Sequence, residues 1–276
     1  MGLQLRLNKF LAERLGVSRR EADDLILANK ITIDGEPAVL GARIDESNKI
    51  CYNNKTIPFQ TEYSYLAFYK PVDYVCSRRA QGKAPTLYEL LPKKYRKLKT
   101  VGRLDKDSSG LILLTNDGDF AFQMTHPKFR KTKVYEVELD KLLEPLHQQM
   151  ISDHGVMLDD GPSQFKVLKD TSAKKASFEG GPEPGKARSS ATTPVADRPL
   201  GRGRPEGSTG VVDAPRKRSF LADEASYTVV LTEGRNRQIR RTFAALGYTV
   251  TKLHRTQFGK YELGNLKPGG YKEFKI

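Results

Sequence analysis

The chain has 276 residues and carries 47 lysines and arginines against 33 aspartates and glutamates, and its net charge of +14 favours a polyanionic partner such as a nucleic acid or an anionic membrane surface. No run approaches the ~20 apolar residues of a membrane-spanning helix, and the N-terminus lacks the apolar centre of a secretory signal, so we expect a cytoplasmic protein without a membrane partner. Two cysteines are too few for a disulfide framework and the four histidines show no metal-ligand spacing with them, so we expect no structural metal.

The first sixty residues predict a compact unit of two short helices and a hairpin. Asn8 can cap the first helix, and Ser18 and Glu21 have the spacing of a capping box at the start of the second. An alternating strand follows and turns back at Asp34-Gly35. Cations spread around such a unit can reach phosphates at several points, although a solvated helical face explains them equally well. The cations concerned are Arg6, Lys9, Arg19, Arg20 and Lys30.

From residue 63 to residue 169 the sequence changes to strands and short helices. Residues 65–70 form an apolar and aromatic strand that a proline ends, and the apolar run 111–114 predicts a short buried strand. Residues 133–139 alternate, with Tyr135, Val137 and Leu139 on one face. A mixed sheet follows from these strands.

Residues 171–218 are rich in Gly, Pro, Ser, Thr, Ala and Arg. A segment of this composition cannot bury enough apolar surface to offset its chain entropy, so we expect it to be disordered. Strand-like sequence resumes directly afterwards, near residue 226, which indicates an insertion within one domain.

The last third contains a predicted amphipathic helix within "GRNRQIRRTFAALGY", whose apolar stripe includes Ile239 and Phe243. At ~100° per residue, Arg240 falls on the flank of this stripe, whereas Arg237 and Arg241 point away from the core. The helix therefore offers one inward-leaning cation and an outward cationic face.

Charged side chains stand directly before the buried strand 111–114, in "VGRLDKDSSGLILLTNDG". A half-buried carboxylate such as Asp105 needs a cation to remain ionised, and Arg240 can supply it if the sheet brings the two together, with Tyr135 as a stacking neighbour. Each residue also has a plainer explanation, because Asp105 can cap a turn, Tyr135 can be an ordinary strand aromatic and Arg240 a solvated helix residue.

Two resemblances bear on that choice. Residues 3–50, which include "LRLNKFLAERLGVSRREADD", resemble the S-four-type (alpha-L) RNA-binding domain, which docks on structured RNA. "GRLDKDSSGLILLTNDG", together with "YLAFYKP" upstream and "LTEGRNRQIRRTFAALGYTVTKLHRTQFG" downstream, strongly resembles the RsuA-type ribosomal RNA pseudouridine synthases. The resemblance implies an α+β fold with a small RNA-binding domain at 3–60, and a catalytic domain at 63–276 built on a mixed, largely antiparallel β-sheet.

Carried over residue by residue, the second resemblance makes Asp105 the catalytic aspartate, Tyr135 the active-site tyrosine and Arg240 the arginine that pairs with the aspartate. Leu253 falls where this family supplies an apolar contact to the base. The residues that we expect to contact the substrate are Arg103, Leu253, Lys70, Arg237 and Arg241.

The activity that this resemblance implies is the isomerisation of a uridine to pseudouridine in ribosomal RNA, by a monomer that acts on a ribosomal subunit assembly intermediate. The target base must leave its stack, and no metal or cofactor is expected. Asp105 could attack the sugar or the base, or help to form a glycal, and the modified uridine could belong to either subunit. Two alternatives are an RNA-binding assembly factor without chemistry and a hydrolase that uses Asp105 and Asp107 as a carboxylate pair.

Overall fold

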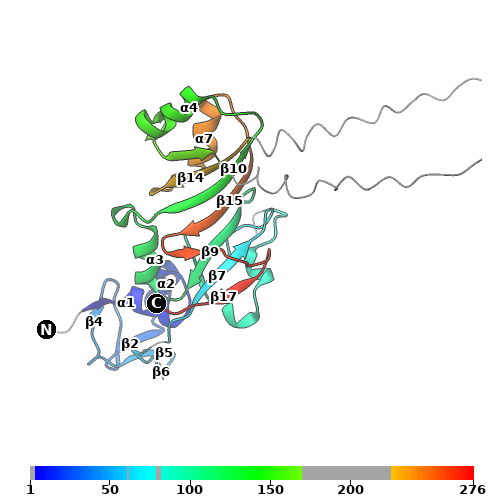
Figure 1. Cartoon of the computed structure of the whole chain (residues 1–276). Helices are drawn as coiled ribbons and strands as arrows, with labels where there is room; N and C mark the ends of the chain where they lie inside the picture. Colours follow the sequence, from blue (N-terminus) through cyan, green and yellow to red (C-terminus); the bar gives the residue numbers. More distant parts are fainter. Residues whose placement is uncertain (1–3, 61, 79–81, 170–224) are drawn as a thin grey trace, which may run out of the picture.

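The computed structural model describes residues 4–60, 62–78, 82–169 and 225–276. A small N-terminal domain lies against one end of a larger domain that is built on one long sheet (Figure 1). The α+β class predicted from the sequence is therefore confirmed, whereas the predicted disordered insertion at 171–218 lies outside the described residues. In the described ranges, no helix combines the length and the apolar character that a membrane crossing requires.

The N-terminal domain has its own core, which is formed by apolar side chains between residues 7 and 57. Two helices pack on a small four-stranded sheet and a short strand pair. Its elements are β1 (Leu5–Arg6), α1 (Leu7–Arg14), α2 (Arg19–Leu27), β2 (Ile31–Ile33), β3 (Glu36–Pro37), β4 (Arg43–Ile44), β5 (Ile50–Tyr52) and β6 (Lys55–Thr56).

The two helix starts of this domain differ in how well the sequence predicted them. The capping box of α2 is confirmed, since the Ser18 hydroxyl accepts from the Glu21 amide and the Glu21 carboxylate accepts from the Ser18 amide. The cap predicted for α1 was wrong, because that helix begins one residue before Asn8 and none of the described side chains caps it. Asn8 instead donates its amide to Asp23 at 3.0 Å and so joins α1 to α2.

The large domain contains a nine-stranded sheet in the order β13-β14-β10-β15-β9-β7-β17, with β16 paired to β15 and β8 to β9. The β15–β9 pair is parallel and the other pairs are antiparallel, as expected for a mixed, largely antiparallel sheet. The strands are β7 (Tyr65–Lys70), β8 (Lys99–Val101), β9 (Ser109–Thr115), β10 (Lys133–Leu139), β13 (Lys166–Lys169), β14 (Ser226–Leu231), β15 (Val250–Phe258), β16 (Tyr261–Glu262) and β17 (Tyr271–Glu273).

Short helices and one small hairpin pack around this sheet. Figure 1 shows α4 and α7 at the end of the domain that is remote from the N-terminal domain, and α3 beside α1 and α2. These elements are η1 (Leu87–Leu90), η2 (Lys93–Tyr95), α3 (Gly118–Thr125), η3 (Pro127–Phe129), α4 (Pro145–Gln149), η4 (Met150–His154), β11 (Val156–Leu158), β12 (Gly161–Ser163) and α7 (Gln238–Ala245).

Strand β9 is buried at every residue because both faces of the sheet are covered there. Ile112 and Leu114 pack into one core, and Leu111 and Leu113 into a second core on the opposite face. Burial on two sides explains why this strand is apolar throughout instead of alternating. β10 buries alternate residues, Tyr135 among them, as its sequence pattern predicted.

The N-terminal domain is held on the large domain by lysines from both sides. Lys9 of α1 forms a 2.6 Å ion pair with Asp119 of α3. Lys99 of β8 donates to the carbonyls of Val17 and Ala12, at 2.7 and 3.3 Å, and thereby binds the C-terminal end of α1. Carbonyls at a helix C-terminus lack helical partners, so a cation is favourable there.

Strand β9 approaches β15 so closely that residue 110 has to be glycine. Gly110 is paired with Arg255 in parallel register and has a φ of +108°. A Cβ at this position would overlap the Arg255 carbonyl and lie 2.6 Å from its amide nitrogen. Both the positive φ and the lack of space next to the Arg255 main chain therefore exclude a side chain at this position.

Gly110→Ala should lower the free energy of unfolding by at least about 3 kcal/mol, because alanine would have to adopt a positive φ and its Cβ would clash with the main chain. Gly16→Ala is the matched control, since Gly16 also has a positive φ but has nothing within 4 Å of an added Cβ. Its cost should stay near 1 kcal/mol. Urea denaturation of the parent and both variants measures the difference, and equal losses would contradict the packing argument.

Candidate functional site

A cavity of about 410 Å³ opens where the β8–β9 loop, the β14–α7 connection and strands β10 and β15 meet. This volume is within the range of small-molecule sites. Five of the residues predicted to act or to bind substrate line the cavity, namely Arg103, Asp105, Tyr135, Arg237 and Leu253. Among the described residues, no group of His, Cys, Asp and Glu side chains has the arrangement of a metal site.

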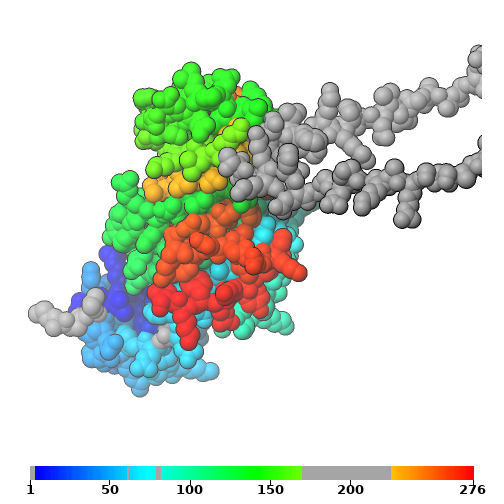
Figure 2. Space-filling model, viewed as in Figure 1, coloured from blue at the N-terminus to red at the C-terminus, as the bar shows by residue number. Residues whose placement is uncertain are grey.

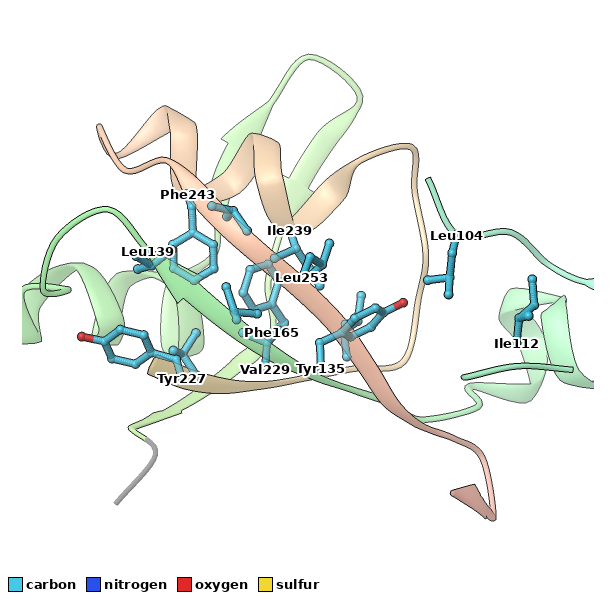
Figure 3. Close-up of a cluster of buried hydrophobic side chains, with 14 of the residues drawn as sticks. Leu104, Ile112, Tyr135, Leu139, Phe165, Tyr227, Val229, Ile239, Phe243 and Leu253 are labelled. Atoms are coloured by element: carbon cyan, nitrogen blue, oxygen red, sulfur yellow. The ribbon is translucent and has the colours of Figure 1, made fainter. Parts of the chain in front are cut away.

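The apolar part of the cavity is formed by side chains from three elements. Tyr135 comes from β10, Leu253 from β15 and Ile239 from α7, and each is less than a tenth exposed. Figure 3 shows Leu253 and Ile239 beside the Tyr135 ring. Together they form an apolar wall opposite charged groups, which suits a flat, partly polar ligand.

The loop between β8 and β9 turns sharply after Asp105, and the Ser108 amide donates to the Asp105 carbonyl at 3.1 Å. This turn separates the two carboxylates of the loop. Asp105 lines the cavity, whereas Asp107 is bonded to arginines at the start of α7. Although both are acids of one short segment, Asp107 accepts the hydrogen bonds of the arginine side chain and Asp105 faces the cavity.

Arg237 contacts both carboxylates. Its two terminal nitrogens donate to Asp107 at 3.0 and 2.8 Å, and Nη1 lies 3.7 Å from an Asp105 oxygen. Partial burial would raise the pKa of Asp107, but the Arg237 hydrogen bonds and the Arg240 charge outweigh burial and lower this pKa. Asp105 keeps about a third of its side chain exposed, with one cation close to it.

The expected pairing of Arg240 with Asp105 needs correction. Arg240 donates to the main-chain carbonyls of Asp107 and Val250, at 2.8 and 2.7 Å, and its Nε lies 3.3 Å from the Asp107 carboxylate. The reason is the turn after Asp105, which directs Asp107 towards α7. Arg240 is close enough to feel the charge of Asp105, but its direct contacts are with the next acid of the loop.

Arg237 and Arg241 both lie away from the core, as predicted, with Arg237 exposed and Arg241 partly exposed. Arg237 nevertheless turns towards the acids of the β8–β9 loop. Arg237 is the residue that precedes α7 and has left-handed backbone angles (φ 46°, ψ 31°), so the helical period does not apply to it. Arg241 is inside the helix and donates to the Asp160 carboxylate at 2.7 Å and to the Asn236 carbonyl. It does not line the cavity that the described residues form, contrary to the expected substrate contact.

Lys70, expected to contact the substrate, is fully buried under the β8–β9 loop. Its ammonium donates to the carbonyls of Ser108 and Pro71 at 2.7 and 2.9 Å, and to that of Lys106 at 3.5 Å. Burial lowers the pKa of Lys70 to about 8, although the nearby acids oppose this shift. Lys70 therefore binds the main chain of the loop from its buried side.

Arg255 is a cavity residue that the sequence interpretation missed. It is 2% exposed and lines the cavity, where Nε donates to the Leu111 carbonyl at 2.7 Å and Nη1 lies 3.4 Å from the Tyr135 hydroxyl. Its buried Nη2 has no hydrogen-bond partner among the described residues. The strand period could have found it, because Arg255 is two residues after Leu253 and therefore shares its face.

The N-terminal cations occupy different environments. Lys9 is engaged in the ion pair with Asp119. The side chains of Arg6, Arg19, Arg20 and Lys30 are exposed. A role in RNA binding stays a prediction for these residues, and the exposed four are the better candidates.

Comparisons with known proteins relate both domains to RNA modification. Residues 64–245 match the RNA pseudouridylate synthase family, and residues 5–50 match the S4 domain. The chain is 30% identical over 271 residues to a ribosomal small subunit pseudouridine synthase A of Pasteurella multocida, a match that covers 97% of this chain and 95% of the relative.

Two further matches extend the relationship. A ribosomal large subunit pseudouridine synthase B of Escherichia coli is 30% identical over 279 residues, which cover 98% of this chain and 79% of the relative. A crystal structure of a pseudouridylate synthase superimposes with a TM-score of 0.58 at 25% identity, and covers 98% of this chain and 96% of that one.

Lys70 should make the stability of the protein depend on pH. Its pKa is about 8 in the folded protein and about 10.4 in an unfolded chain, so between these values the unfolded chain binds more protons. Below about pH 8 the buried ammonium is charged and its burial destabilises the folded protein. As the pH rises above this value, Lys70 loses its proton and the destabilisation decreases. The free energy of unfolding of the parent, relative to that of Lys70→Met, should therefore rise by on the order of 1 kcal/mol per pH unit from pH 8 to pH 9.5. Urea denaturation across this range measures it, and a constant difference would contradict the assignment.

Proposed function

We propose that this chain, which belongs to the RNA pseudouridylate synthase family, isomerises a uridine of ribosomal RNA with Asp105 as its catalytic residue. As a family member it is an RNA pseudouridine synthase. The observation that carries the assignment of Asp105 is its position, because its partly exposed carboxylate lines the cavity opposite the apolar wall of Tyr135, Leu253 and Ile239.

The reaction exchanges one bond of the ribose for another. The bond from ribose C1′ to uracil N1 breaks, a bond from C1′ to C5 forms, the proton on C5 is released and N1 takes up a proton. An ionised Asp105 can take a proton from the sugar, attack the sugar or add to the base, and each route uses the same carboxylate. The Arg237 guanidinium at 3.7 Å compensates its charge without a short hydrogen bond.

The flipped uracil is proposed to lie against the apolar wall. Leaving the stack costs a few kcal/mol, which ring contacts with Tyr135 and apolar contacts with Leu253 can offset. Arg255 lines the same cavity, and its buried Nη2, which has no partner among the described residues, is the donor that we assign to a carbonyl or hydroxyl oxygen of the nucleotide. Arg103 is exposed on the cavity lining and can meet a phosphate.

A ribosomal RNA substrate is supported by the relatives, whose names refer to the small and the large ribosomal subunit. The S4 domain and the net charge of +14 agree with an RNA partner. Such a substrate would place the enzyme in the cytoplasm, as composition also favours. Action as a monomer on an assembly intermediate stays a prediction from the sequence.

The hydrolase alternative loses its support in this geometry. A hydrolase of that kind needs two carboxylates that face one substrate. Asp107 accepts two hydrogen bonds from Arg237 and contacts Arg240, so it is not available as the partner of Asp105. Its role is to hold the arginines.

Asp105→Asn should lower the rate of isomerisation at least about a thousandfold while RNA binding persists, because the size is kept and the reactive charge is removed. The rate is measured as tritium released from C5 of labelled uridine in ribosomal RNA, and binding is measured separately. Near-parental release would refute the catalytic assignment and leave Asp105 as an ordinary turn residue.

Asp107→Asn is the matched control for that change. It removes the same charge two residues away and weakens the contacts with Arg237, so the loop should become looser. We expect a loss of about tenfold with activity still measurable. If Asp107→Asn were the more damaging of the two substitutions, the roles of the acids would have to be exchanged.

Replacing Arg6, Arg19, Arg20 and Lys30 together by Gln should weaken RNA binding and make it less sensitive to salt. Each lost phosphate contact reduces the slope of log affinity against log salt by about 0.7 to 0.9. Lys141→Gln, between β10 and α4, with Lys166→Gln, the first residue of β13, is the control and should leave the slope unchanged. Figure 1 shows α4 at the end of the large domain that is remote from the N-terminal domain. An identical slope in the quadruple variant and the control would contradict RNA binding by these four residues.

A further inference from the structure

An exposed cluster of aromatic rings lies on α3 and η3, at the edge of the cavity. We call it the aromatic platform and define it as Phe122, His126 and Phe129 with the ammonium of Lys128. Phe122 is 45% exposed and Phe129 is 37% exposed. Large apolar side chains are usually buried, and an exposed group of them beside a ligand site indicates an interaction surface.

The rings of the platform support one another instead of packing into the core. The centroids of Phe122 and His126 are 4.7 Å apart, and Phe122 meets Phe129 edge to face at 5.8 Å. The main-chain amide of Lys128 donates to His126 Nδ1 at 3.2 Å, which fixes the turn that carries the second phenylalanine. The surface is therefore preorganised, and its outer side is open to solvent.

A cation is built into this surface. The Lys128 ammonium lies 5.1 Å from the centre of the Phe122 ring and 4.7 Å from that of Phe129. The following residue after η3, Arg130, is exposed as well. Aromatic faces next to cations have the composition of single-strand nucleic-acid sites, where bases stack on rings and cations meet the backbone.

The position of α3 connects the platform with both RNA-binding regions. At its first turn, Asp119 is paired with Lys9 of the N-terminal domain. At its last turn, Thr125 lines the cavity, as does Pro127 of η3. The eight residues of this helix span about 12 Å. Figure 2 shows the green surface of α3 and the following turn projecting directly above the blue N-terminal domain.

From this placement we propose that the aromatic platform stacks an unpaired base of the substrate RNA that is a neighbour of the flipped uridine. A strand that reaches from the N-terminal cations to the cavity passes along α3 and so meets these rings. The class of substrate rests on the proposed function, but the stacking itself can be tested without catalysis. A protein partner would use the apolar surface differently, since it would not depend on nucleobases.

The test compares two RNA probes on the full-length protein. One is a fluorescein-labelled oligoadenylate of twelve nucleotides, and the other has the same length and charge but carries abasic ribose at each position. Replacing Phe122 and Phe129 together by Ala should weaken binding of the oligoadenylate about 5- to 150-fold and leave the abasic probe unchanged. Fluorescence anisotropy gives both affinities.

Control variants separate stacking from other effects. Replacing both residues by Tyr should retain the affinity for oligoadenylate, because a ring remains at each position. Lys128→Gln should weaken both probes and lower the salt dependence. Leu146→Ala, at a residue that is 64% exposed on α4, should change neither affinity. Thermal unfolding checks that the variants are folded.

Equal effects of the double Ala substitution on the two probes, or no effect on either, would overturn the proposal and leave the platform as a surface for a protein partner. Isomerisation by the parent enzyme and by Asp105→Asn is measured in parallel. If Asp105→Asn stays active while the probes behave as expected, the catalytic assignment fails and the platform stands. If Asp105→Asn is inactive but the double Ala substitution does not distinguish the two probes, the catalytic assignment is retained and only the stacking proposal fails.

Discussion

The parallel pairing of β9 with β15 holds the two halves of the sheet together and sets the distances across the cavity. On one side of it lie β10, β14 and β13, and on the other lie β7 and β17. Asp105 is carried by the loop before β9, whereas Leu253 and Arg255 are on β15 and Tyr135 is on the next strand. The close approach at Gly110 and the 2.8 Å contact between Ser109 and His254 keep this pairing in one register. A shift here would separate the carboxylate from the wall that it faces.

The charged residues around the β8–β9 loop give its two acids different environments. Arg237 makes its short hydrogen bonds to Asp107, and Arg240 binds the main chain and side chain of the same residue. Lys70 binds the loop carbonyls from the buried side. Because the arginines are occupied by Asp107, Asp105 is left with a cation at 3.7 Å and with access to solvent. A carboxylate locked in a bidentate pair would be a poor nucleophile or base, so this arrangement agrees with the catalytic role proposed for Asp105.

Patterns with a fixed period predicted the fold well, and the fine geometry of the site depended on turns that have no period. The alternation of β10 placed Tyr135 on the buried face, and the capping box started α2 where expected. The turn after Asp105 and the left-handed backbone of Arg237 decide which acid meets which arginine, and neither is encoded in a helical or strand repeat. The burial of Lys70 likewise follows from the loop that folds over it, which its own strand does not specify.

The anchoring of Lys99 to the end of α1 has a consequence for how the enzyme selects its target. Together with the ion pair between Lys9 and Asp119, it fixes the N-terminal domain on the sheet. Under the proposed function, one RNA would then contact the protein at two places of fixed separation, with its phosphates on the N-terminal domain and the target uridine in the cavity. An RNA whose three-dimensional fold holds that uridine at another separation cannot satisfy both, whatever its sequence. Selection of this kind would depend on a distance within the folded RNA, and therefore on the contacts that fix the two protein domains to each other.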